Sequence, residues 1–383
     1  MKILKILFFV LFFANCGYVA TKFIHFNNIP KPNGEYNVGS SKFFWIDESR
    51  QEWYLDNLKN KRKLMAQIWY PAKDIGNLNA LYYIERIDER VKYIAHELGV
   101  PDYLLKNISK IKSNSYLDAP SEEGLFPVIL FSHGLGGMRT QNTIQAEALA
   151  SRGYIVIATD HMYDSNIVLY PDGMIATNIS HTDSLSENQW YEIRGKQLDF
   201  RTGDISFLID RVEDINKGII NTSLKGKINL NKIGIFGHSY GGATSILSSI
   251  IDNRIDACLT LDAWFVPLKE NILKQKYDKP FLHVGQKKWS NEMNYQKLDL
   301  FLDNCINDKY KLIVKDSKHF DFTDIPHFSN LTQRLGISGK IDKNDLKSII
   351  NELTIGFFDY HLKNINLFEP ENISKQYEKL ILF

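Results

Sequence analysis

The chain has 383 residues, with 46 Lys and Arg against 45 Asp and Glu, so its formal net charge is +1. Hydrophobic residues make up 44% and charged residues 24%, which is typical of a globular protein and excludes disorder, collagen and coiled coil as the main state. The balanced charge gives no support for a nucleic-acid partner, which usually needs a basic face or stripe.

The three cysteines are too few for a disulfide framework. Cys258 and Cys305 allow one bridge in an oxidising compartment, although we expect two buried free thiols instead. No CxxC, HExxH or paired-His spacing occurs, so we expect no metal and no cofactor.

The N-terminus has the order of an export signal. Lys2 and Lys5 accompany the apolar run 6–14, which is too short for a membrane span of about 20 residues but fits the apolar region of a secretory signal. Cys16 follows in a loose lipoprotein box. We therefore expect residues 1–17 to be a signal peptide or an N-terminal membrane or lipid anchor. The protein is then exported, as a secreted, periplasmic or membrane-anchored form, and lipidation at Cys16 is an alternative to simple cleavage.

Further along the chain, short apolar runs alternate with helical patterns. The apolar runs predict strands at 65–72, 128–133, 154–160, 232–236, 257–261, 280–284 and 310–314. The helical patterns lie at 140–152, 188–216, 241–251 and 342–363. Near-continuous apolar strands separated by helices indicate an α/β protein with a mostly parallel central sheet covered by helices on both faces. No internal repeat is visible, and we expect one catalytic domain over residues 30–370.

One amphipathic stretch, residues 80–106, does not belong to this alternation. Its apolar residues recur at helical spacing: Ile84, Ile87, Val91, Ile94 and Leu98. Such a stretch fits either an interfacial helix that rests on lipid or a helix packed on the core, and we favour the core.

A candidate nucleophile stands between a predicted strand and a predicted helix. Residues 237–241 read Gly-His-Ser-Tyr-Gly. In this motif a strained strand-to-helix turn exposes the serine Oγ, and the flanking positions need glycine because a Cβ there would clash with its neighbours. The following helix points its amides at the site and favours negative charge there. A Gly-rich turn that merely packs is the alternative, but the placement favours Ser239 as the nucleophile of an α/β-hydrolase fold.

The serine needs a base to take its proton, and in the α/β-hydrolase order the acid and then the histidine follow it. His319 stands in the loop after the predicted strand 310–314, where the base belongs. His283 lies inside a strand and His361 inside the last helix, so we expect both to be core or surface residues. His327 is the fallback for the base.

The candidate acid is Asp262, which directly follows the predicted strand 257–261. No Asp or Glu follows strand 280–284, where the acid usually stands. Asp262 would hold the imidazole tautomer and stabilise the imidazolium. The alternative is a helix-cap or turn aspartate, a role that Asp256 or Asp316 fits better.

The turn 133–137, His-Gly-Leu-Gly-Gly, matches the loop that supplies one oxyanion amide in these hydrolases, and the residue after the serine supplies the other. We therefore assign the oxyanion hole to the amides of Leu135 and Tyr240. A nucleotide-binding interpretation is weak because GLGG is not GxGxxG. We interpret His133 and His238 as residues that brace the two turns.

Three segments together resemble the secreted, plasma-type platelet-activating factor acetylhydrolases, a group VII phospholipase A2. They are FSHGLGGMRT at 131–140, IFGHSYGGAT at 235–244 and LTLDAWFVPL at 259–268. The likeness covers roughly residues 30–330, and the acid in LDAW is its most specific element. Segments 86–116 and 165–190 depart from the pattern.

The resemblance implies a triad of Ser239, Asp262 and His319, with Leu135 and Tyr240 as the oxyanion donors. It implies calcium-independent hydrolysis of a short or oxidised sn-2 acyl chain. The expected partner is a phospholipid or short-acyl ester, with association to a membrane or lipid surface and no nucleic acid.

Two other functions stay open from the sequence. A secreted general carboxylesterase or polyester hydrolase would use the same triad. A catalytically silent lipid-binding or adhesion protein on this scaffold is the third possibility, and the presence of every triad residue argues against it. Trp264 and Phe265, beside the acid, fit an acyl pocket and the core equally well.

Overall fold

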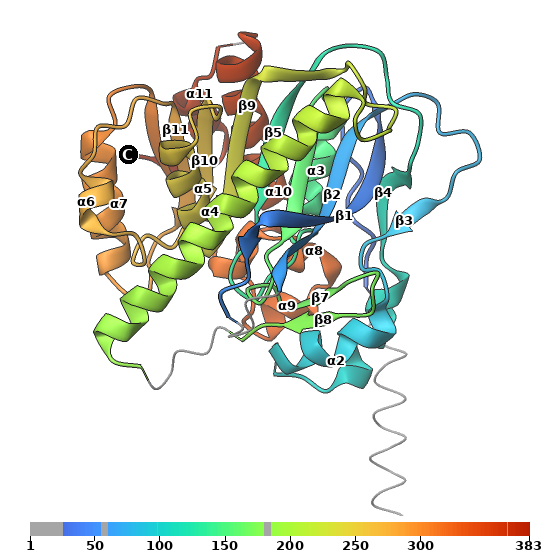
Figure 1. The fold of residues 1–383 in the computed structure, drawn as a ribbon. Helices are drawn as coiled ribbons and strands as arrows, with labels where there is room; N and C mark the ends of the chain where they lie inside the picture. The colour runs from blue at the N-terminus through green and yellow to red at the C-terminus, as the bar shows by residue number, and fades with distance from the viewer. Residues whose placement is uncertain (1–25, 55–59, 98, 180–184, 366) are drawn as a thin grey trace, which may run out of the picture.

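The computed structural model describes residues 26–54, 60–97, 99–179, 185–365 and 367–383 (Figure 1). The expected signal peptide or anchor, residues 1–17, lies outside these ranges. Within them, no helix is long and apolar enough to cross a membrane.

An eleven-stranded sheet forms the centre of the molecule, in the order β13-β12-β11-β10-β9-β5-β6-β2-β1-β4-β3. Neighbouring strands from β12 to β6 pair in parallel. These strands are β5 (Phe126–Ser132), β6 (Ile155–Asp160), β9 (Ile228–His238), β10 (Ala257–Leu261), β11 (Phe281–Gln286) and β12 (Lys309–Val314). Every residue of β5, β6 and β10 is buried, which explains why the sequence shows continuous apolar runs there.

The edges of the sheet depart from the parallel pattern. β2 pairs antiparallel with β6 and with β1, and β13 pairs antiparallel with β12. These and the remaining strands are β1 (Asn37–Gln51), β2 (Lys61–Ala72), β3 (Ala80–Tyr82), β4 (Lys112–Leu117) and β13 (Leu380–Leu382). A separate hairpin joins β7 (Ile167–Leu169) to β8 (Ile175–Thr177).

Helices cover both faces of the sheet (Figure 1). One face packs against α4 (Glu187–Lys217), α5 (Tyr240–Ile251) and α7 (Met293–Asn304). The other packs against α3 (Thr143–Ala150) and α10 (Lys343–Phe358). The mostly parallel sheet between two helical layers confirms the predicted α/β-hydrolase fold.

The amphipathic stretch 80–106 is broken into separate elements. After β3 the chain forms α2 (Ile87–Glu97) and then the 3₁₀ helix η1 (Asp102–Lys110). Gly99 adopts a positive φ of 64°, and Pro101 has no amide to continue a helix. The inner side chains pack in a small cluster apart from the two large ones; Leu98 lies outside the described residues.

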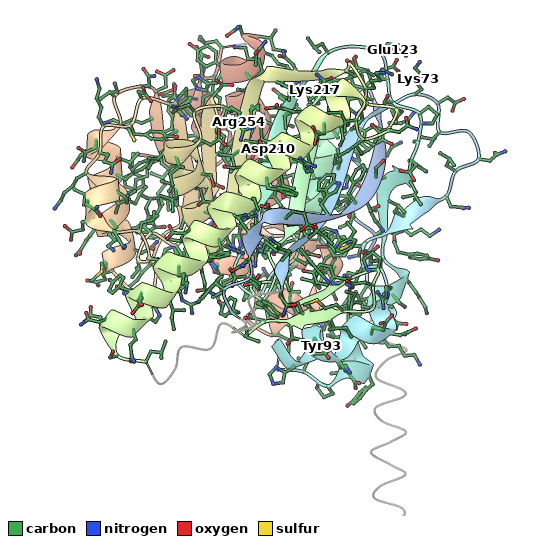
Figure 2. The ribbon with its side chains drawn as sticks, in the orientation of Figure 1. Lys73, Tyr93, Glu123, Asp210, Lys217 and Arg254 are labelled. Atoms are coloured by element: carbon green, nitrogen blue, oxygen red, sulfur yellow. The ribbon has the colours of Figure 1, made fainter. Side chains whose placement is uncertain are left out.

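Exposed ion pairs lie away from this cluster. Lys73 pairs with Glu123, and Arg254 pairs with Asp210. In Figure 2 these residues lie in the upper half of the molecule, whereas Tyr93 on α2 marks the lower end. The lower end is where the parallel strands finish, and it holds the candidate site.

Candidate active site

Ser239 sits on a strained turn between β9 and α5. Its backbone angles are φ 56° and ψ −120°, which L-residues rarely adopt. A Cβ on Gly237 would lie 2.2 Å from the carbonyl oxygen of Gly241, and one on Gly241 would lie 1.9 Å from that of Ser132. Both positions therefore require glycine, for the steric reason that the sequence motif predicts. The turn holds Ser239 at the end of β9, directly before the first residue of α5.

The structure brings the three predicted polar residues into one hydrogen-bonded row. His319 Nε2 lies 2.9 Å from Ser239 Oγ, and His319 Nδ1 lies 2.6 Å from Asp262 Oδ2. The three side chains follow β9, β10 and β12, whose carboxyl ends meet at one edge of the sheet. Since a carboxylate only accepts hydrogen bonds, Nδ1 carries the proton and Nε2 is left to accept one from the serine.

Asp262 is fully buried and accepts several hydrogen bonds in addition to that of His319. Its carboxylate accepts from Gln286 N at 3.0 Å, Gln286 Nε2 at 2.8 Å and Trp289 Nε1 at 2.9 Å. Burial alone would raise the pKa of this carboxyl, but the bonds and charge of His319, with Gln286, lower it below its ordinary value. The sequence alone did not indicate Gln286 and Trp289, although Gln286 ends β11 and Trp289 follows it, in the place where α/β-hydrolases usually carry the acid.

The loop 133–137 lies against the serine. A Cβ on Gly134 would come within 3.3 Å of the Cβ of Ser239. Among the described residues, the backbone amides of Leu135 and Tyr240 have no protein acceptor. Both amides are thus free to donate to a ligand oxygen, which is the property that an oxyanion donor needs.

His133 braces this loop through a set of buried hydrogen bonds. It is fully buried, and its Nε2 accepts from Ser165 Oγ at 2.9 Å and from the amide of His161 at 3.2 Å. Arg201 Nη2 donates to the carbonyl of His133 at 3.0 Å. Burial, and then the charge of Arg201, hold the pKa of His133 well below its ordinary value, so it is neutral. It therefore fixes the loop, as the sequence indicated.

The other histidines after the serine lie elsewhere. His283 is buried on β11, with Nδ1 2.9 Å from Thr260 Oγ1. His327 lies in the short helix α8 (Ile325–Phe328), and His361 lies in the π turn η3 (Asp359–Lys363). Of the histidines in the described ranges, only His319 lies within hydrogen-bonding distance of Ser239.

A cavity of about 920 Å³ opens beside Ser239 and has two unlike sides. We call one side the polar floor; it comprises residues 134–137, 141, 238–239, 286, 288–290 and 318–319. We call the other the apolar wall; it comprises residues 83–84, residues 104, 105 and 108 of η1, and residues 325, 328, 329, 331, 332 and 335–337. No carboxylate of the described residues lines the cavity, and in the same ranges no cluster of three or more His, Cys, Asp or Glu side chains could hold a metal ion.

Of the aromatic residues beside Asp262, Phe265 belongs to the core and the half-buried Trp264 packs against it. Phe265 is fully buried, and Trp264 packs against Trp190 and Tyr240 with ring centroids 5.6 and 5.7 Å away. Neither lines the cavity. Cys258 and Cys305 are likewise buried, and both are free thiols.

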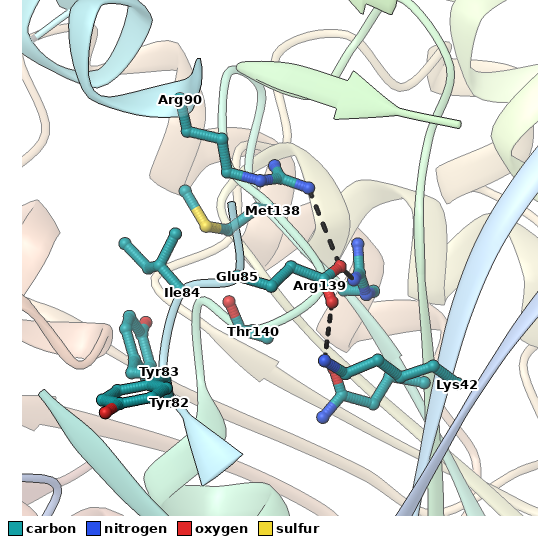
Figure 3. Close-up of a pocket in the computed structure, with 10 residues that line it drawn as sticks. Lys42, Tyr82, Tyr83, Ile84, Glu85, Arg90, Met138, Arg139 and Thr140 are labelled. Carbon is teal, nitrogen blue, oxygen red and sulfur yellow. Dashed lines mark hydrogen bonds and ion pairs between the residues drawn. The ribbon is translucent and has the colours of Figure 1, made fainter. Parts of the chain in front are cut away.

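An ion cluster centred on Glu85 connects the start of the apolar wall, at residues 83–84, to β1 and to the loop that carries Arg139 (Figure 3). Glu85 pairs with Lys42 of β1 at 2.6 Å, with Arg139 in close contact, and with Arg90 of α2 at 3.9 Å. Arg139 also pairs with the fully buried Asp160. Burial alone would raise the pKa of Glu85, but Arg139 and Lys42 outweigh it and lower the pKa to about 2. The carboxylate thus stays charged and links the wall to the loop after the polar floor.

The chain is similar to known esterases over most of its length. A family model described as platelet-activating factor acetylhydrolase, isoform II, matches residues 22–378. The platelet-activating factor acetylhydrolase of Cavia porcellus is 27% identical over 363 residues, which are 89% of this chain and 79% of that relative. A probable 1-alkyl-2-acetylglycerophosphocholine esterase of Arthroderma benhamiae is 24% identical over 224 residues, 56% of this chain and 53% of its own.

The fold is also found among solved structures. A ferulic acid esterase from Streptomyces cinnamoneus superposes with a TM-score of 0.76 at 23% sequence identity. The match covers 93% of this chain and 99% of that one, so the two proteins share the whole architecture.

Proposed function

We propose that this chain, which belongs to the platelet-activating factor acetylhydrolase, isoform II, family and is a carboxylic ester hydrolase, removes short or oxidised sn-2 acyl chains from phospholipids. The observation that carries the proposal is the row of hydrogen bonds from Ser239 through His319 to Asp262, which opens onto a cavity of about 920 Å³. Ser239, Asp262 and His319 are the proposed catalytic residues.

In the first half of the proposed reaction, Ser239 Oγ attacks the ester carbonyl while His319 Nε2 takes its proton. Asp262 holds the Nδ1 proton of His319 and stabilises the imidazolium that forms. The negative charge on the carbonyl oxygen is met by the amides of Leu135 and Tyr240 and by the N-terminus of α5. Each such donor is typically worth about 100- to 1000-fold in rate.

In the second half, the imidazolium gives its proton to the departing alcohol oxygen. The lysophospholipid departs, and the acyl group stays bound to Ser239 as an acyl-enzyme. Water then attacks the acyl carbonyl with His319 as the base, which frees the acid and restores the serine. Amides and a helix end meet the developing charge, so we propose that the reaction is independent of calcium.

The cavity supports a lipid substrate over a small soluble ester. Binding pockets for drug-sized ligands measure about 300–1,000 Å³, and this cavity of about 920 Å³ lies at the upper end of that range. A short acyl group needs little of this space, whereas the apolar wall has room for a second, long alkyl chain. Burying each methylene of such a chain is worth about 0.8 kcal/mol.

We also propose that the protein works at a lipid surface. Phe320 is 43% exposed and Leu335 is 66% exposed, and both line the cavity, so large apolar side chains face water at its mouth. Sedimentation with phosphatidylcholine vesicles tests this, and Phe320→Ser combined with Leu335→Ser should reduce the bound fraction. Equal binding of the wild type and the variant would contradict it.

We propose, finally, that the protein is exported, because Lys2 and Lys5 accompany the apolar run 6–14. Cell fractionation and the mass of the mature N-terminus test this. A diacylated Cys16 would indicate a lipoprotein, and cleavage without lipid a soluble exported form. A full-length protein in the cytoplasm would contradict the proposal.

The decisive experiment uses the full-length protein with chelator present throughout. Its substrates are 1-hexadecyl-glycerophosphocholines whose sn-2 chains run from acetyl to palmitoyl, with an aryl acetate alongside. We expect hydrolysis of the short chains, and a loss of about 10⁴- to 10⁶-fold in Ser239→Ala. Ser248→Ala is the matched control: it lies on α5, its buried hydroxyl has no partner among the described residues, and full activity is expected.

Each other outcome has a definite meaning. Hydrolysis of the aryl acetate without any phosphatidylcholine hydrolysis would favour the general carboxylesterase or polyester hydrolase. Inactivity on every substrate, with folded protein, would overturn the mechanism and leave a silent lipid-binding scaffold. Full activity in Ser239→Ala would overturn the assignment of the nucleophile.

A further inference from the structure

Three hydrogen bonds connect the oxyanion loop to the backbone of His319. The amide of Gly134 donates to Gln141 Oε1 at 3.2 Å. Gln141 Nε2 lies 2.8 Å from His238 Nδ1, and His238 Nε2 lies 3.0 Å from the carbonyl oxygen of His319. These three hydrogen bonds therefore link the loop after β5, through the serine turn, to the loop after β12.

The first of these hydrogen bonds decides which group donates and which accepts in the other two. A backbone amide can only donate, so Gln141 must turn its oxygen to Gly134 and its NH₂ group toward His238. The second hydrogen of that group points to Asn142 Oδ1 at 3.3 Å, which agrees with the same orientation. His238 Nδ1 must then accept, so the ring proton sits on Nε2 and is donated to the carbonyl of His319.

His238 must also remain neutral if all three hydrogen bonds are to form. A proton on its Nδ1 would face the NH₂ group of Gln141, which offers no acceptor. Burial, and then repulsion by His319, lower the pKa of His238 to about 3. The rings of His238 and His319 lie 4.5 Å apart between centroids, so His319 gains its proton beside an uncharged neighbour.

We propose that Gln141 and His238 are positioning residues that hold the backbone of the base His319 in register with the oxyanion loop, in a relay of fixed hydrogen-bond direction. Neither residue exchanges a proton with the substrate. The inference rests on the proposed function, because it gives His319 the role of the base. It adds a reason for His and Gln at positions 238 and 141, which the serine motif alone does not require.

The relay matters because its two ends must act together on one substrate carbonyl. Leu135, next to Gly134, would bind the carbonyl oxygen while His319 takes the serine proton. Displacements of about 1 Å at a reacting centre can cost about 100-fold in rate, and a loop end is free to shift by that much without a tether. A broken relay should therefore lower kcat and leave substrate binding in the apolar wall intact.

The first test measures the tautomer of His238 and does not depend on enzyme activity. Nitrogen-15 spectra of the histidine side chains in the full-length protein should show His238 as the neutral Nε2–H tautomer from pH 5 to 8. In Gln141→Met, the Nδ1 signal should lose its hydrogen bond. A protonated His238 at pH 6, or the Nδ1–H tautomer, would overturn the proposal even if the enzyme is active.

The second test is kinetic and uses two variants with a rescue. His238→Phe should lower kcat on the order of tenfold with KM within about twofold, and His238→Gln should recover part of the loss because its NH₂ group can reach the carbonyl of His319. The double variant with Gln141→Met should be no slower than His238→Phe alone. Gln67→Met is the matched control, since Gln67 is a buried glutamine on β2 that donates to Ser40 Oγ.

The outcomes separate this proposal from the proposed function. If the wild type hydrolyses no ester, the function fails while the tautomer of His238 can still be read. If the wild type is active and the losses in the two single variants add in the double variant, or if His238→Gln is as slow as His238→Phe with equal thermal stability, the relay is overturned and the triad stands.

Discussion

The polar floor and the apolar wall of the cavity are built in different ways. The floor consists of turns at the carboxyl ends of β5, β9, β11 and β12, which are long-range neighbours in one sheet between two large hydrophobic clusters. The wall consists of short pieces, such as η1, α8 (Ile325–Phe328) and α9 (Leu331–Arg334), around a small separate cluster. The floor is fixed by the central sheet, whereas the wall is attached to the body through individual contacts, such as the hydrogen bond from Lys318 Nζ to the carbonyl of Gly336 at 2.7 Å.

This difference assigns the chemical step to the floor and the choice of substrate to the wall. A change in the wall can reshape the space for the lipid without moving Ser239, because none of the wall residues defined above is a hydrogen-bond partner of Ser239, His319 or Asp262. Loops and short helices on a rigid scaffold commonly carry specificity in this way. The comparison predicts that floor variants lose rate on every ester, whereas wall variants lose affinity for long-chain substrates only.

The largest expected effect concerns Asp262, the buried acid that holds the floor residue His319. Asp262→Asn places an amide where four donors converge on a carboxylate, so His319 loses the acceptor that fixes its tautomer. We expect kcat to fall about 10⁴-fold on phospholipid and aryl acetate alike. Asp256→Asn is the matched control, because Asp256 is exposed at the opposite end of β10 and its carboxylate accepts from the amide of Ile233 at 2.9 Å.

The same variant tests the pKa of Asp262. Its folded pKa is lowered, so the charged carboxyl stabilises the fold above the unfolded value near 3.9, and this contribution is lost as the pH falls through the folded pKa. The stability difference between wild type and Asp262→Asn should therefore shrink below about pH 4 in urea unfolding. A difference that grows on acidification would contradict the assigned direction.

The next effect concerns the backbone of the turn that carries the floor residue Ser239. Gly241→Ala would place a Cβ 1.9 Å from the carbonyl oxygen of Ser132, so β5 and α5 must separate. We expect the free energy of unfolding to fall by about 3 kcal/mol. We also expect activity to be lost on all esters. In Gly195→Ala on α4 the nearest atom would be Lys269 Cε at 3.8 Å, so this control should be as stable as the wild type or more so. Equal stability of the two variants would refute the steric argument.

The catalytic row could be predicted from the sequence and the wall could not, for a physical reason. Ser239, Asp262 and His319 each follow an apolar run, and parallel strands bring their carboxyl ends to one edge, so order along the chain implied proximity. The wall depends on how Gly99 and Pro101 divide the stretch 80–106. The donors Gln286, Trp289 and Gln141 escaped notice because amide and indole side chains have no motif of their own. Their roles appear only when the acid and the serine turn have positions in space.

A smaller effect is expected where the wall is attached. Glu85→Gln weakens the pairs with Lys42 and Arg139, but Arg139 keeps its partner Asp160, so the loss should lie between an exposed and a buried ion pair, about 2 kcal/mol. Because the folded pKa of Glu85 is about 2, below its ordinary 4.5, this contribution is present above about pH 4.5 and disappears as the pH approaches 2.

Thermal melting of Glu85→Gln at pH 7 and pH 3 tests the size and the sign of this contribution. The matched control is Glu89→Gln, whose carboxylate pairs with Arg86 at the surface and should change stability little. KM for the hexadecyl substrate should rise while kcat on aryl acetate stays unchanged. A loss of kcat on aryl acetate would show that the wall and the floor are coupled more tightly than their contacts indicate.

The smallest expected effect sharpens the comparison most, because it changes binding alone. Leu335 is 66% exposed and lines the cavity, whereas Leu125 is 60% exposed and does not. Each loses the same three carbons on substitution by alanine, and neither change should alter folding, since both side chains face water. When a hexadecyl chain binds, it covers only Leu335, so Leu335→Ala should lose about 1 kcal/mol of binding, or about a fivefold rise in KM. For a substrate with a two-carbon sn-1 chain the two variants should behave alike. If Leu335→Ala raised KM equally for both chain lengths, the long chain would not lie along the apolar wall, and the size of the cavity would say nothing about the substrate.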